Sequence, residues 1–427
     1  MPALTAERAF LLVPFLAGLA PAQDEPGGSQ ATGNVVPADA AGWQALSRDL
    51  FLSGESSLVD PGRIEPLPRQ IFKLGPVELL PKLDEQLVYD DNIFLTEDDE
   101  EEDFILRTGL GLLADYRFGS NQHRLSAGYD MTRNWFIGGD ARNFVEQLAS
   151  AQLELRFRRL EIAVGDRFED RTDPILSVFT GKIERTINTA HGRVAWREDD
   201  WALELRGQRS TTAFDDSSFE AFDRDEDLLA LEASAKQSED VTAFVRVDAM
   251  GRSYEEPGLN DMDGIAGSVG VRAKRGTELD GMVRVGVRAE SFDDDAATDS
   301  DDSAINPEVE ARARWWLIQA AALEARVERT TEFSPVSNYQ VTTRGELTWM
   351  HQLETRLSAR VGGGIEHVDP SNTDAAFVRY TAGAGLRYAL TDNADVTLGW
   401  RLRLRNTKAA TGDYTGNQFT LGFALRL

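Results

Sequence analysis

The sequence predicts an all-β protein: a transmembrane antiparallel up-and-down β-barrel of about 18 strands, with a short irregular N-terminal extension. Apolar and polar residues alternate in segments of about ten residues from about residue 78 to residue 427. In each segment one set is almost purely apolar and the other is rich in Arg and Glu. The connections between segments are alternately short and long, which is typical of outer-membrane barrels.

The last two segments show the alternation most clearly. Phe419, Leu421, Phe423, Leu425 and Leu427 share one face of the final segment. The segment before it places Val396, Leu398, Trp400, Leu402 and Leu404 opposite Arg401, Arg403 and Arg405. Because successive side chains of a strand point to opposite faces, the apolar set would meet lipid and the charged set a wet lumen.

Connection lengths predict how the strands are joined. Short turns are expected near 119–122, 158–159, 197–200, 238–240, 276–277, 318–321, 352–354 and 391–394, and longer loops near 91–103, 137–143, 170–181, 213–225, 255–263, 292–306, 331–338, 369–375 and 406–416. Aromatic residues lie beside the short turns, as an interfacial girdle would require: Phe118, Phe157, Trp196, Trp201, Trp315, Trp349 and Tyr388. In hydrocarbon every backbone polar group needs an internal partner, so the segment around Leu83 and Leu87 must pair with the one ending at Leu427.

The N-terminal part has a different texture. Arg8, an apolar run over 9–20 and the small residues Ala20 and Ala22 predict a signal peptide over 1–22, although a buried apolar helix would also fit. Residues 23–77 are predicted to be a periplasmic linker, with a flexible start, a short amphipathic helix over 41–56 and an extended proline-rich stretch. The sequence leaves open whether this extension lies in the periplasm or enters the barrel (78–427) as a plug.

Composition excludes several functions. The chain has 45 Lys and Arg against 72 Asp and Glu, a formal net charge of −27, which argues against a nucleic-acid partner. It has 0 Cys, so disulfides, thiolate zinc sites and Cys–His catalysis are excluded. No mature segment is apolar for the length of a membrane helix, so a membrane-spanning form must use strands.

The stretch Tyr89-Asp90-Asp91-Asn92-Ile93-Phe94 closes the first strand and opens an acidic loop. It resembles the opening strand of the putative β-barrel porin 2 family. The resemblance implies the outer membrane of a Gram-negative bacterium and components of exopolysaccharide or capsule export as partners. Outer-membrane barrels commonly end in Phe or Trp, which the barrel-assembly machinery recognises, whereas this chain ends in Leu427.

We expect no enzyme activity and no cofactor. The four His residues show no metal-binding spacing, and only a Ser–His–acid set built on His367 and Glu366 could be imagined. Acidic runs at 97–103, 215–227 and 293–302 could hold Ca²⁺ or Mg²⁺ loosely and bridge lipopolysaccharide in the surrounding outer-membrane lipid. They could equally be solvated loops, which is the interpretation we favour.

Arginines on the predicted lumen face are the candidate selectivity residues. They are Arg284, Arg288, Arg312, Arg314, Arg344, Arg360, Arg379, Arg387, Arg401, Arg403 and Arg405. They could form a cationic track for anionic solutes or acidic glycans, or pair with acids across strands and stiffen the wall. The expected function is a passive channel for hydrophilic solutes or exported polysaccharide; the alternative is a structural or adhesion barrel acting through its acidic loops.

Overall fold

A computed structural model describes residues 72–426 except 121, 140–142, 174–182, 256–259, 277, 294–302, 319, 335–336, 372–375 and 409–411. The predicted signal peptide and most of the predicted extension therefore lie outside the described residues. The described part is one antiparallel sheet. No helix within it is both long and apolar enough to cross a membrane.

The strands are β1 Phe72–Leu74, β2 Val77–Asp90, β3 Asp103–Phe118, β4 His123–Phe136, β5 Phe144–Arg156, β6 Leu160–Asp173, β7 Ile183–Arg197, β8 Trp201–Phe214, β9 Arg224–Lys236, β10 Val241–Tyr254, β11 Met262–Arg275, β12 Leu279–Phe292, β13 Ser303–Ile318, β14 Ala321–Glu332, β15 Gln340–Glu354, β16 Leu357–Pro370, β17 Phe377–Ala389, β18 Ala394–Thr407 and β19 Tyr414–Arg426. A short 3₁₀ turn, η2 (Glu220–Phe222), lies between β8 and β9.

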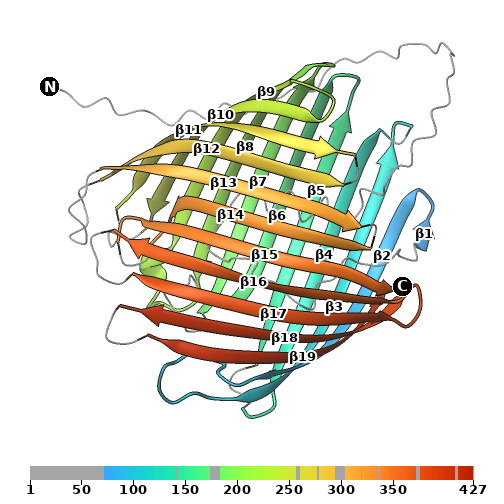
Figure 1. Ribbon diagram of the computed structural model, residues 1–427, viewed down its shortest axis with the longest axis vertical. Helices are drawn as coiled ribbons and strands as arrows, with labels where there is room; N and C mark the ends of the chain where they lie inside the picture. The colour runs from blue at the N-terminus through green and yellow to red at the C-terminus, as the bar shows by residue number, and fades with distance from the viewer. Residues whose placement is uncertain are drawn as a thin grey trace. The chain divides into compact units, whose positions relative to one another are not determined.

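Strands β2 to β19 form a closed ring in which each strand pairs with its sequence neighbours (Figure 1). The ring closes where β19 pairs with β2, from Gln418 opposite Asp90 to Arg426 opposite Lys82. The expected barrel of 18 strands is therefore confirmed. β1 pairs with β2 as one extra strand, so the sheet has 19 strands in total. Closure leaves no open edge, which is what a sheet in hydrocarbon requires.

The turns fall where the sequence placed them. β3 ends at Phe118 and β4 begins at His123, and all eight short turns agree within a few residues. The nine longer connections lie at the end of the barrel opposite the short turns. Some predicted loops were too long: β13 already begins at Ser303 within the predicted loop 292–306, and β6 continues to Asp173 within 170–181. Asp225 and Asp227, predicted to lie in an acidic loop, are part of β9 and pair with Arg209.

Side chains alternate between the two faces as predicted. The outer face of β12 carries Val283, Val285 and Val287, which are about half exposed, while Arg284 and Arg288 on the other face are mostly covered. The aromatic residues beside the short turns are exposed on the outer face, for example Trp201 and Trp315. This arrangement places an apolar surface outside and a charged lining inside.

Candidate functional site: the charged lumen wall

All eleven arginines predicted to line the lumen lie on its face of the wall. They occupy β12, β13, β15, β16, β17 and β18, alternating with exposed apolar residues on the outer face. The register divides them into two groups. Arginines of β12 to β16 such as Arg284 and Arg344 have carboxylates as cross-strand neighbours, whereas on β17 and β18 arginines outnumber carboxylates.

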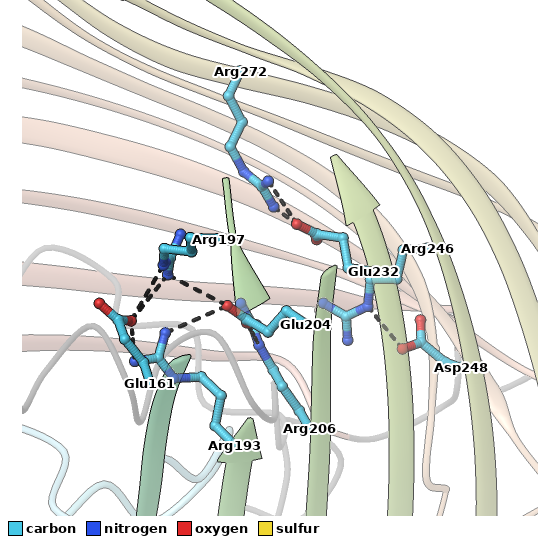
Figure 2. A network of polar contacts seen from close by, with 9 residues as sticks. All are labelled: Glu161, Arg193, Arg197, Glu204, Arg206, Glu232, Arg246, Asp248 and Arg272. Atoms are coloured by element: carbon cyan, nitrogen blue, oxygen red, sulfur yellow. Dashed lines mark hydrogen bonds and ion pairs between the residues drawn. The ribbon is translucent and has the colours of Figure 1, made fainter. Parts of the chain in front are cut away.

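Carboxylates accompany the arginines over β6 to β11 (Figure 2). Arg193 lies between Glu161 and Glu204, at 3.3 and 3.4 Å. Further along, Arg272 Nη1 and Nη2 donate to the two carboxylate oxygens of Glu232 at 2.7 and 2.8 Å. This bidentate geometry is the strong form of the Arg–carboxylate pair. In this part of the wall the ion pairs join adjacent strands or, for Arg272 and Glu232, strands on either side of β10, and they stiffen the barrel.

Ion pairs between arginines and carboxylates of different strands continue over β12 to β16. One row of register partners crosses the wall there: Arg284, Glu310, Glu328, Arg344 and Glu366. Arg284 Nη2 lies 3.1 Å from Glu310 Oε2, and Arg344 pairs with both Glu328 and Glu332. For these strands the structure favours cross-strand pairing over an unbroken cationic track.

The balance changes on β17 and β18. Their lumen faces carry five arginines and one carboxylate. The arginines are Arg379, Arg387, Arg401, Arg403 and Arg405, and the carboxylate is Asp395. Asp395 accepts from Arg387 at 2.8 Å and also pairs with Arg426. We call the lumen face of β17 and β18 the basic wall, because positive charge is concentrated there.

The motif Tyr89–Phe94 lies at the seam where the ring closes. Asp90 pairs with Arg403 at 2.9 Å. The Asn92 side-chain amide donates to the carbonyls of Thr96 and Thr415, at 2.7 and 3.0 Å. Asn92 is fully buried, so each of its polar atoms needs such a partner. The motif therefore fastens the first loop to the last strand and orients one arginine of the basic wall.

Aromatic residues at the long-loop end join strands that are distant in the sheet, which the sequence analysis did not foresee. Phe333, just after β14, shares a buried cluster with Ile183 of β7 and Phe214 of β8, although β9 to β13 lie between in the sheet. The guanidinium carbons of Arg224 and Arg252 lie 4.4 and 5.3 Å from the Phe333 ring centroid. The segment after β14 therefore reaches across to the opposite strands.

A hydrogen bond and an aromatic stack hold the same segment at two more points. The Asn260 amide donates to Asn338 Oδ1 at 2.9 Å, and Tyr339 stacks on Phe292 with ring centroids 5.7 Å apart. The signal that could have revealed this arrangement was the presence of Phe219, Phe222 and Phe333 in otherwise polar loops.

The structure does not assemble the Ser–His–acid set considered for His367 and Glu366. Glu366 faces the lumen and pairs with Arg379, whereas His367, the next residue of the same strand, points to the outer face. Within the described ranges no three acidic or His side chains are arranged to hold a metal ion. Much of the acidic run at 293–302 lies outside these ranges.

The chain aligns with several solved structures at low identity. OccK9 (OpdG) of Pseudomonas aeruginosa is 12% identical over 82% of this chain and 98% of its own, with a TM-score of 0.48. OccAB3 of Acinetobacter baumannii is 9% identical over 82% and 99%, with a TM-score of 0.48. The P. aeruginosa outer membrane protein opdK is 11% identical over 82% and 99%, with a TM-score of 0.47.

No curated protein sequence matches the chain. The family model described as Putative beta-barrel porin 2 matches residues 72–427, which is the whole barrel including β1. The match covers well over half of the chain and includes the motif at the seam and the basic wall. The protein belongs to the Putative beta-barrel porin 2 family.

Proposed function

We propose that the protein is a passive channel of the outer membrane of a Gram-negative bacterium, and that it passes hydrophilic solutes with a preference for anions. The basic wall is the observation that carries this proposal. The lumen faces of β17 and β18 carry five arginines and one carboxylate, and the further carboxylates that pair with them, Glu366 and Asp90, come from the neighbouring strands β16 and β2. A local excess of positive charge in a lumen raises the concentration of anions and lowers the barrier to their passage.

Location in the outer membrane is supported by the family and by the outer surface. The apolar residues of β12, β18 and β19 are exposed on that surface, as lipid contact requires. Separation of inner and outer membranes on a density gradient tests it. Recovery of the protein in the soluble or inner-membrane fraction would contradict the proposal.

Bilayer recording of the refolded protein tests the channel itself. We expect stepwise conductance and, in a salt gradient, a reversal potential displaced toward that of chloride. The recording is made with the chain starting at Gln23 and with a variant that starts at Phe72, and folding is checked by heat-modifiable gel mobility. Folded protein that never conducts in either form would refute the channel.

Exported acidic polysaccharide is the more specific substrate that the family resemblance suggests. The basic wall supports it, because the carboxylates of an acidic glycan could pair with arginines spaced along β18. The test compares conductance block by an acidic oligosaccharide and by a neutral one of equal length. Equal block by both would show that the wall does not select for the glycan's charge.

A further inference from the structure

A row of polar side chains crosses the outer face of β2, β3 and β4, strands that lie side by side in the barrel (Figure 1). Glu85 lies opposite Thr108, and Thr108 lies opposite Arg133. The rows on either side are apolar: Leu87, Leu106 and Trp135 toward the long loops, and Leu83, Leu110 and Met131 toward the short turns. We call Glu85, Thr108 and Arg133 the charged row. It lies within the apolar surface and not at its border.

The two charges of this row have no counter-charge beside them in the barrel wall. Glu85 accepts a hydrogen bond from the Thr108 hydroxyl at 2.9 Å, and the guanidinium carbon of Arg133 lies 4.9 Å from the centroid of the Trp135 ring. β2 and β4 are two strand spacings apart, roughly 10 Å. Within the described ranges neither Glu85 nor Arg133 forms an ion pair, whereas Arg209, also on the outer face, pairs with two carboxylates of β9.

On the opposite side of the ring the described outer face is apolar. β12 lies nine strands from β3. Three successive outer rows over β11, β12 and β13 consist of Ile265, Ala289 and Ile305, of Gly267, Val287 and Pro307, and of Val269, Val285 and Val309. Charged side chains that face lipid destabilise a barrel, most of all at mid-depth. The charged row is therefore unfavourable unless something other than lipid covers it.

The order of the charges makes the row complementary to itself. From β2 to β4 it reads negative, neutral, positive. A two-fold axis along the membrane normal, passing beside Thr108, reverses this order in a second copy. Glu85 of each copy then faces Arg133 of the partner subunit, and two ion pairs form in a place where salt screens them little. An anionic lipid headgroup would neutralise Arg133 only and would be repelled by Glu85.

We propose that two copies of this protein associate as a two-fold dimer through the outer face of β2, β3 and β4, with the charged row at its centre. Exposed leucines around the row supply the apolar packing: Leu87, Leu106, Leu110 and Leu112. Each barrel keeps its own lumen, so the dimer does not depend on what the lumen conducts.

The mass of the purified native protein in detergent, measured by analytical ultracentrifugation, is the first test. We expect two chains per particle. One chain per particle at all concentrations would overturn the proposal, and one chain with tightly bound lipopolysaccharide would assign the charged row to lipid instead. Three chains would also overturn it, because a contact in a three-fold ring joins two different faces.

Crosslinking locates the contact, and it needs only one introduced thiol because the chain has 0 Cys. Thr108→Cys places that thiol beside the two-fold axis, so a short bifunctional thiol reagent applied to outer membranes should link two copies. Val285→Cys is the matched control, because Val285 is exposed on the outer face of β12. A linked dimer from Thr108→Cys alone is the expected result. Equal linking at both positions would indicate random collision, and linking only at Val285→Cys, or at neither position, would place the contact elsewhere; each of these results overturns the proposal.

Charge reversal tests the ion pairs. Glu85→Arg and Arg133→Glu each set like charges opposite one another across the axis, so each variant alone should be monomeric. Refolded together with different tags, the two variants should form a mixed dimer, because every contact across the axis then joins opposite charges. Heat-modifiable gel mobility checks that each variant folds. Dimers of either variant alone, or a mixture that stays monomeric, would overturn the pairing.

A neutral variant covers the case in which the reversed charges prevent folding. Glu85→Gln combined with Arg133→Gln adds no charge to the lipid face, so it should fold, and its linked fraction with Thr108→Cys should fall several-fold. An unchanged linked fraction would show that the charges do not hold the dimer. A dimer that never conducts would instead contradict the proposed channel and leave this interface intact.

Discussion

Asp91 and Asn417 lie 326 residues apart in the chain and hold the barrel seam with two parallel hydrogen bonds. The Asn417 backbone N–H donates to Asp91 Oδ1 at 2.6 Å, and its side-chain amide donates to Asp91 Oδ2 at 2.9 Å. The Asp91 backbone N–H donates in return to the Asn417 carbonyl at 3.1 Å. The first long loop is thereby fixed to the last strand at the point where the ring closes.

Asp91→Ala should weaken this closure. The substitution leaves the Asn417 donors without their acceptor in a partly buried place, which typically costs about 1–3 kcal/mol. The urea midpoint of refolded protein, followed by loss of heat-modifiable gel mobility, should fall. Asp98→Ala in the exposed part of the same loop is the control and should leave the midpoint unchanged. Equal midpoints for the two variants would mean that the seam bonds add nothing.

The orientation of side chains on β18 and β19 predicts opposite outcomes for an arginine introduced on the outer face and one introduced on the lumen face. Leu398 is exposed on the outer face. Leu398→Arg should lower the free energy of unfolding by about 2–4 kcal/mol, the cost of an Arg at the bilayer midplane, and so reduce the folding yield. Thr420→Arg places the same charge on the lumen side of the adjoining strand and should fold normally. Folding yield in liposomes measures both, and similar yields would show that the assigned faces are wrong.

Asp166 breaks the apolar outer surface at the middle of β6. It lies between Val164 and Phe168, both exposed on the same face, and opposite Ala151 and Ala190. A carboxylate facing lipid costs less than an arginine but is still unfavourable. Asp166→Leu should therefore stabilise the barrel by up to about 2 kcal/mol.

The unfolding midpoint of Asp166→Leu in liposomes tests that expectation. Arg167→Leu is the matched control, because Arg167 faces the lumen and pairs with Glu169 at 2.6 Å, so its loss should destabilise. A lower midpoint for Asp166→Leu would show that this carboxylate has a favourable partner in the membrane.

Much of the fold could be predicted because it depends on local periodicity. Alternation with a period of two fixes which face meets lipid, and turn positions such as 119–122 follow from breaks in it. Contacts between strands that are distant in the sequence have no periodic signal. The contact of Phe333 with Ile183 and the hydrogen bonds between Asp91 and Asn417 could therefore not be predicted. Asp166 was missed for a related reason, since a single polar residue does not change the period of β6.

The candidate site was predictable as a set of residues but not as a distribution of charge. Sequence placed Arg344 and Arg401 on the same lumen face. The register between strands then decides that Arg344 lies opposite Glu328 and Glu366, whereas Arg401 lies opposite Gly383. Pairing and basic excess therefore could not be separated until the strands were aligned.

Ion selectivity should depend on the basic wall. Arg401→Gln removes one positive charge from the lumen, so the reversal potential in a salt gradient should move toward that of the cation. Arg133→Gln removes the same charge from the outer face, where Arg133 stacks on Trp135 at 4.9 Å, and should leave the reversal potential unchanged. Equal shifts in both variants would assign the effect to net charge and not to the wall.

Phe333 should limit conductance at the long-loop end. Its ring is 5% exposed and packs against Phe222 and Tyr254 as well as the cluster with Ile183 and Phe214. Phe333→Ala removes the ring that joins the two sides of the mouth, so single-channel conductance should rise and closures should shorten. Phe419→Ala, which removes a ring from the lipid-facing surface, is the control for general loosening of the barrel. If Phe333→Ala and Phe419→Ala conduct alike, the constriction lies elsewhere in the lumen, because the mouth would then already be wide enough to impose no resistance.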